Sequence, residues 1–87
     1  MPTVFIPPML RPLAENRESI SVTGSTLSEV IEQLETLCPG IRSRLCDENG
    51  VRPELSVSVD DSIVSKGLAE VVSKDAEIHF LPALGGG

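Results

Sequence analysis

The residues with the clearest chemical potential are the last three, Gly85, Gly86 and Gly87, which follow an apolar segment and Pro82. Successive glycines lack side chains and favour neither helix nor strand, so they predict a flexible segment that fits a narrow channel. Fully extended, the tail from Pro82 onward reaches about 20 Å. A flexible end without a function is the alternative that the glycines alone leave open.

The reactive group of this tail would be the carboxylate of Gly87. A terminal carboxyl group has a pKa near 3.5, so it is ionised at neutral pH and is a poor electrophile. It must therefore be activated, for instance as an acyl-adenylate. The sequence contains no phosphate-binding loop, so we expect a separate enzyme to use ATP for this step. We expect the chain itself to be no enzyme, with no bound cofactor and no catalytic residue.

The other reactive residue types lack a chemical pattern. Cys38 and Cys46 form no CxxC or Cys/His motif, so we expect two reduced, partly buried thiols, with a disulfide or redox pair as the alternative. His79 has no histidine neighbour, which argues against a metal site and a catalytic base. The adjacent carboxylates Asp60 and Asp61 could serve acid–base chemistry or bind a metal, but they are more typical of a turn.

Composition excludes several partners. The 87 residues contain 13 Asp and Glu against 7 Lys and Arg, which gives a net charge of −6, and the two Phe are the only aromatic residues. A nucleic-acid partner needs basic residues and stacking surfaces, and an anionic membrane would repel the chain. The start of the sequence has no basic region and its apolar stretch is broken by prolines, so we expect no signal peptide and a cytoplasmic protein.

Two alternating segments and one helix open the chain. Residues 3–6 and 19–23 alternate between polar and apolar residues and predict two strands that pair as a hairpin, with a turn around Met9 and Leu13 between them. Thr26 and Glu29 have the spacing of a capping box, in which each side chain satisfies a backbone donor. The helix behind them has one apolar face: Leu27, Val30, Ile31, Leu34 and Leu37. Its carboxylates, Glu29, Glu32 and Glu35, indicate a solvated face, with a cluster that binds a cation or a basic partner as the alternative.

The second half contains a short turn at 41–45, a loop at 47–50, strands at 55–59, 63–64 and 77–81, and a turn at 67–69. The last strand is the most apolar, so we expect it at the centre of the sheet beside the first strand. The order of elements predicts an α+β β-grasp (ubiquitin-like) fold, a mixed sheet of four to five strands covered by one main helix. We expect a β-grasp domain at 1–81 and a flexible tail at 82–87.

Strand alternation also predicts the two faces of the sheet. Phe5, His79 and Leu81 should lie on the open face as a partner-binding patch, unless the tail or loops cover them. We include Leu84 of the tail in this patch. The expected inward set is Val4, Ile6, Ile20, Val22, Leu27, Val30, Ile31, Leu34, Leu55, Val57, Val59, Leu68, Ile78 and Phe80.

The whole chain resembles the MoaD/ThiS family of ubiquitin-like sulfur carriers, and within it the CysO-type carriers of a cysteine synthesis route. The matching segments are Val4-Phe5-Ile6-Pro7, Leu10-Arg11-Pro12, Gly24-Ser25-Thr26-Leu27, Pro39-Gly40-Ile41, and Phe80-Leu81-Pro82-Ala83-Leu84 running into Gly86-Gly87. Gly86 and Gly87 match the diglycine of the family. Gly85 stands where relatives often have another small residue. The resemblance therefore implies a role in tail threading less directly for Gly85 than for Gly86.

This resemblance implies a mechanism and partners. An E1-like enzyme of the MoeB/ThiF type would adenylate Gly87 with ATP, and a sulfur donor would convert it to a thiocarboxylate. The acceptor would be an activated serine held by a cysteine synthase, and a JAMM-type metalloprotease would release the new cysteine. A ubiquitin-like modifier conjugated through Gly87 and a molybdopterin synthase small subunit are the alternatives. The sequence does not decide which pathway receives the sulfur.

Overall fold

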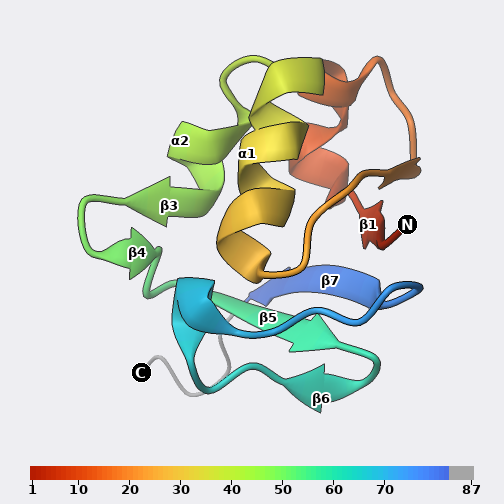
Figure 1. Ribbon diagram of the computed structural model, residues 1–87. Helices are drawn as coiled ribbons and strands as arrows, with labels where there is room; N and C mark the ends of the chain where they lie inside the picture. Colours follow the sequence, from red (N-terminus) through yellow and green to blue (C-terminus); the bar gives the residue numbers. More distant parts are fainter. Residues whose placement is uncertain (83–87) are drawn as a thin grey trace.

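The computed structural model describes residues 1–82 and contains a five-stranded mixed sheet with α1 packed on one face (Figure 1). Its strand order is β2-β1-β7-β5-β6. The central strand β7 runs parallel to β1 and antiparallel to β5. The strands are β1 Thr3–Phe5, β2 Ser19–Ser21, β5 Leu55–Val59, β6 Ser62–Ile63 and β7 Glu77–Pro82. The predicted hairpin and the central place of the last strand are confirmed.

The connections carry short elements that the sequence did not predict as such. A 3-10 helix, η1 (Pro8–Ala14), replaces the expected turn after β1. A second, two-stranded sheet of β3 (Cys46–Asp47) and β4 (Gly50–Val51) encloses the expected loop. Elements this short have too few residues to establish a period. The remaining helices are α1 (Leu27–Leu37), α2 (Ile41–Leu45) and the 3-10 turn η2 (Gly67–Ala69). Among residues 1–82, none of these helices has the length and hydropathy that crossing a bilayer requires.

The main helix α1 begins as its sequence predicts. The Glu29 backbone N–H donates to Thr26 Oγ1 over 3.2 Å. The Glu29 carboxylate accepts from the Ser25 backbone N–H at 2.8 Å, one residue earlier than the capping box that we expected. At the other end the apolar face is shorter than predicted. Leu37 is half exposed, and the buried position of the last turn belongs to Cys38.

The core lies between α1 and the sheet. Every residue of the expected inward set is buried or packs against the buried cluster. The sequence missed eight further core residues, most of them on short elements or connections: Leu10, Ala14, Cys38, Ile41, Leu45, Cys46, Val72 and Ala76. Several come from η1 and α2, so these short helices extend the hydrophobic core beyond what one helix and one sheet would bury.

Four strands differ from the prediction at their ends. β1 and β2 are shorter than expected and end at Phe5 and Ser21, rather than at residues 6 and 23. The turn between β5 and β6 contains Asp60 and Asp61, with φ values of 50° and 70°. Two residues with positive φ between paired strands form a type I′ hairpin, which matches the twist of the strands. The return strand is therefore Ser62–Ile63 rather than 63–64. At the end of the sheet, β7 continues to Pro82, which pairs with Leu55.

Candidate functional site

The open face of the sheet carries one row of residues that crosses all five strands. Phe5 is the register partner of both Ser19 and His79, His79 pairs with Ser58, and Ser58 pairs with Ile63. Register partners on neighbouring strands point to the same side, so this row shares one face. The Phe5 and His79 rings stack with centroids 4.3 Å apart and an angle of 2° between their planes. The predicted meeting of Phe5 and His79 is therefore confirmed.

Leu81 extends this surface along β7. It lies two residues beyond His79, on the same side of the strand, and is 41% exposed. On the far side of the row, Ile63 is 64% exposed and is the register partner of Ser58, which is itself buried. We call Phe5, His79, Leu81 and Ile63 the open-face patch. Among the described residues it gathers four large side chains on the open face, an arrangement typical of protein-binding surfaces.

Sequence reasoning missed Ile63 because it placed the return strand one residue too late. The signal was present in the two carboxylates of the turn. A two-residue hairpin at Asp60-Asp61 pairs Val59 with Ser62 and Ser58 with Ile63, which puts Ile63 on the face opposite to Val59.

A cleft of about 500 Å³ borders the Phe5–His79 stack on the side of η1. Arg11 and Glu18 line it together with the two rings. The Arg11 Nε donates to the carbonyl oxygen of Ile6 at 3.2 Å, which holds the guanidinium beside the strand. The open-face patch thus has one charged border, and docking surfaces commonly have a polar rim of this kind.

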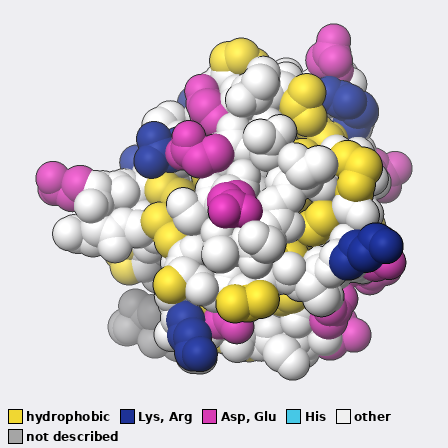
Figure 2. Space-filling view, viewed as in Figure 1, with side chains coloured by type: hydrophobic (Ala, Val, Ile, Leu, Met, Phe, Trp, Pro, Cys, Tyr) yellow, Lys and Arg dark blue, Asp and Glu magenta, His cyan; other side chains and the backbone are white. Residues whose placement is uncertain are grey.

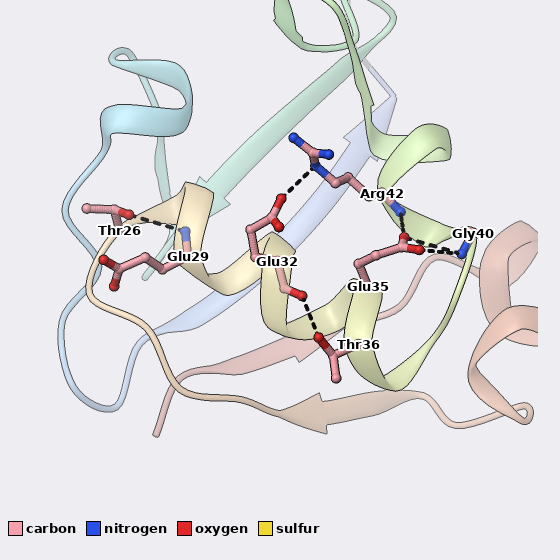
Figure 3. A network of polar contacts seen from close by, with 7 residues as sticks. All are labelled: Thr26, Glu29, Glu32, Glu35, Thr36, Gly40 and Arg42. Atoms are coloured by element: carbon pink, nitrogen blue, oxygen red, sulfur yellow. Dashed lines mark hydrogen bonds and ion pairs between the residues drawn. The ribbon is translucent and has the colours of Figure 1, made fainter.

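The helix carboxylates are used within the domain (Figure 3). The Glu35 carboxylate accepts the Gly40 backbone N–H at 3.0 Å and the Arg42 N–H at 2.9 Å. These two bonds hold the pKa of Glu35 below its ordinary value of 4.5. Glu32 forms a 2.7 Å ion pair with the Arg42 guanidinium. Bonds from Ser25 lower the pKa of Glu29 in the same way. The solvated helix face is thus the interpretation that the geometry supports, with these carboxylates capping and joining helices.

On the face seen in Figure 2, acidic and basic side chains are interspersed and hydrophobic side chains form separate small groups. Within residues 1–82, the structure contains no cluster of three or more His, Cys, Asp or Glu side chains that could hold a metal ion. The Asp60 carboxylate accepts the Glu77 backbone N–H at 2.9 Å, so it fastens the hairpin to β7. The interpretation of the Asp60-Asp61 pair as a turn is confirmed.

Both cysteines are free thiols, as expected, and both are more deeply buried than the sequence predicts. Burial raises the pKa of the Cys38 thiol and of the Cys46 thiol, which keeps both protonated at neutral pH. A protonated, enclosed thiol is a weak nucleophile, so neither cysteine is a candidate for chemistry. The remaining predicted site residues, Leu84, Gly85, Gly86 and Gly87, lie outside the described residues, and their roles stay predictions.

Comparison with known proteins agrees with this architecture. The ThiS family model matches residues 4–87. The sulfur carrier protein CysO of Mycobacterium tuberculosis is 37% identical over 90 residues, which cover 98% of this chain and 97% of that protein. CysO of Mycobacterium bovis matches equally well.

Solved structures give the same result. A chain of the Amycolatopsis orientalis BexX/CysO complex superimposes with a TM-score of 0.91 at 34% identity, with all of both chains covered. The crystal structure of Mycobacterium tuberculosis CysO gives a TM-score of 0.89 at 34% identity, covering 97% of this chain and all of that one. SAMP1, a small archaeal modifier protein of Haloferax volcanii, has a TM-score of 0.72 at 19% identity over 99% of this chain and 98% of its own, which shows a shared fold alone.

Proposed function

Since the chain belongs to the ThiS family, we propose that it is a sulfur carrier protein that delivers sulfur for cysteine biosynthesis from a thiocarboxylate at Gly87. The observation that carries this proposal is the 37% identity to the sulfur carrier CysO over almost the whole length of both proteins. The other two candidates are not favoured. The likeness to archaeal modifier proteins lies below 20% identity, and no relative named above is a molybdopterin synthase subunit.

The chemistry proceeds in two steps on one carboxylate. An E1-like enzyme of the MoeB/ThiF type joins a Gly87 oxygen to the α-phosphorus of ATP and releases pyrophosphate. A sulfide donor then attacks the acyl carbon and expels AMP, which leaves sulfur in place of oxygen. The thiocarboxylate sulfur attacks the β-carbon of an activated serine held by a cysteine synthase and displaces the activating group. A JAMM-type metalloprotease then uses water to cleave the new cysteine from the tail, which restores the Gly87 carboxylate. The chain contributes the carboxylate and a surface, and no catalytic group.

The fold supports a carrier that supplies the carboxylate and a docking surface, while its partner enzymes supply the catalytic groups. Phe5, His79, Leu81 and Ile63 form an apolar patch on the open face, and β7, which carries two of them, leads directly into the tail. We infer that partner enzymes dock on the open-face patch while the three glycines enter the active site. The CysO structure from Amycolatopsis orientalis is itself that of a complex with BexX.

The proposal is tested by the intact mass of the protein isolated from its native host. A carrier loaded with sulfur has a mass increased by the replacement of one oxygen with one sulfur at an unbroken Gly87 end. Adducts that join Gly87 to lysines of other proteins would instead identify a modifier. An unmodified end in sulfur-replete cells, together with normal growth without cysteine after deletion of Gly86 and Gly87, would exclude both functions.

A further inference from the structure

A groove of about 420 Å³ opens where β7 ends. Its lining is mostly apolar: Leu10 and Phe80 form the buried part, and Met9, Leu81 and Pro82 form the exposed walls. We call it the tail-exit groove. It is distinct from the open-face patch and adjoins it, because Leu81 belongs to both.

Met9 is the most unusual residue of this groove. It lies on η1, is 76% exposed, and stands next to a cavity that its side chain does not fill. A methionine side chain is flexible and polarizable, so it adapts well to the shape of a partner. An exposed methionine beside a concave apolar surface is a feature of binding sites.

The rim of the groove is basic although the chain is acidic overall. Arg44 and Arg52 line it together with one carboxylate, Glu54, against a net charge of −6 for the whole chain. The Arg52 Nε and Nη2 donate to the carbonyl oxygen of Ser43 at 3.0 and 2.9 Å. Within residues 1–82 the Arg44 guanidinium has no hydrogen bond and no ion pair. None of these residues therefore prevents it from pairing with a carboxylate of another molecule.

The start of the tail is part of this groove. Pro82 lines it, and the five residues from 83 to 87 span about 18 Å at most. Any enzyme that encloses the Gly87 carboxylate must therefore bring its own surface to within that distance of the groove. The Gly87 carboxylate cannot react while it is paired with a residue of its own chain. In the reactive complex this carboxylate therefore lies in the enzyme and leaves the groove open to the enzyme surface.

We propose that the tail-exit groove binds an apolar side chain of the tail-activating enzyme, and that Arg44 pairs with a carboxylate next to that side chain. This inference rests on the proposed function, since it assumes that an enzyme takes the tail. It names a second contact beyond the open-face patch, with a chemistry of its own: one apolar anchor and one acidic group.

The test uses the full-length chain and the MoeB/ThiF-type enzyme of the same host. ATP–pyrophosphate exchange is measured while the carrier concentration is varied. Met9→Asp and Arg44→Glu should each raise the KM for the carrier about tenfold and leave kcat unchanged, because they weaken binding rather than chemistry. The matched controls are Val71→Asp, at a residue 73% exposed outside the groove, and Lys66→Glu; both should behave as the wild type.

Each other outcome overturns the inference in a recognisable way. A wild-type chain that supports no exchange contradicts the proposed function and the inference together. If the wild type supports exchange and the Met9 and Arg44 variants behave like the controls, the groove does not bind the enzyme, and the proposed function is unaffected. Dimers that Met9→Asp dissociates in analytical ultracentrifugation would identify a second copy as the occupant. A Met9 methyl resonance that Leu84→Asp shifts in the free carrier would identify the tail itself.

Discussion

At the scale of single residues, the candidate surface depends on the stack of Phe5 on His79. Its two members come from strands that are far apart in the sequence and adjacent in the sheet. Stacked aromatic pairs gain energy beyond the area that they bury, so the stack restricts the orientations of both rings. A surface whose side chains are ordered beforehand loses little side-chain entropy when a partner binds.

Phe5→Ala removes this stack and should weaken the complex with the activating enzyme about tenfold, because aromatic anchors at the centre of an interface dominate its binding energy. Isothermal titration calorimetry with the two purified proteins measures the change. Leu37→Ala, at a half-exposed leucine at the end of α1 on the other side of the sheet, is the matched control. Equal affinities for the two variants would rule out the open-face patch as the docking surface.

At the scale of elements, the long, periodic segments were predictable and the short ones were not. The alternation around Ile20 and Val57 identified strands, and the capping residues Thr26 and Glu29 fixed the start of α1. Nothing in the sequence distinguished η1 from a turn, because a 3-10 helix with two prolines has no apolar period. The sequence therefore predicts only a turn around Met9, and it does not predict the groove beside this residue.

One side chain joins the two helices that follow one another. Glu35, near the end of α1, accepts backbone N–H groups at the start of α2 and replaces the side-chain cap that Gly40 cannot supply (Figure 3). Glu35→Gln should lower the Tm by a few degrees, because a neutral amide accepts these bonds more weakly than a carboxylate. Thermal unfolding followed by circular dichroism measures the shift, with Glu48→Gln, on an exposed turn, as the control.

The same contact predicts a pH dependence. The pKa of Glu35 is lower in the folded chain than its ordinary value of 4.5, so the folded state favours the ionised form. Its contribution is complete above pH 4.5 and is lost as the pH falls through the lowered pKa. The Tm difference between the wild type and Glu35→Gln should therefore shrink below pH 4. A difference that stays constant from pH 7 to pH 3 would contradict the role of the carboxylate charge.

Gly24 allows the segment before α1 to pass close to the backbone of this helix. Gly24 has a φ of +146°, and a Cβ added there would lie 2.9 Å from the Val30 backbone nitrogen. Gly24→Ala combines backbone strain with a clash that a side-chain rotation cannot relieve. The control Gly50→Ala, with a φ of +120° and no atom within 4 Å, has the strain alone and should cost about 1–3 kcal/mol. Urea unfolding should show a clearly larger loss for Gly24→Ala; equal losses would contradict the clash.

At the scale of the whole molecule, one strand connects stability to function. The inward residues of β7, Ile78 and Phe80, lie in the core, while its outward residues, His79 and Leu81, form half of the open-face patch. The strand then leads into the glycines. A small domain can serve as a carrier because the proposed chemistry needs one carboxylate and a surface that presents it. The net charge of −6 suits enzymes with basic docking surfaces, apart from the basic rim of the tail-exit groove.

The most direct test of the account is a reconstitution with purified components. The chain is incubated with its activating enzyme, ATP and a sulfide donor, and the peptide that contains residues 83–87 is sequenced by mass spectrometry. We expect one oxygen to be exchanged for sulfur at Gly87, the exchange to require ATP, and a chain lacking Gly87 to remain unmodified. Sulfur at Cys38 or Cys46 with an unchanged Gly87 would contradict this expectation.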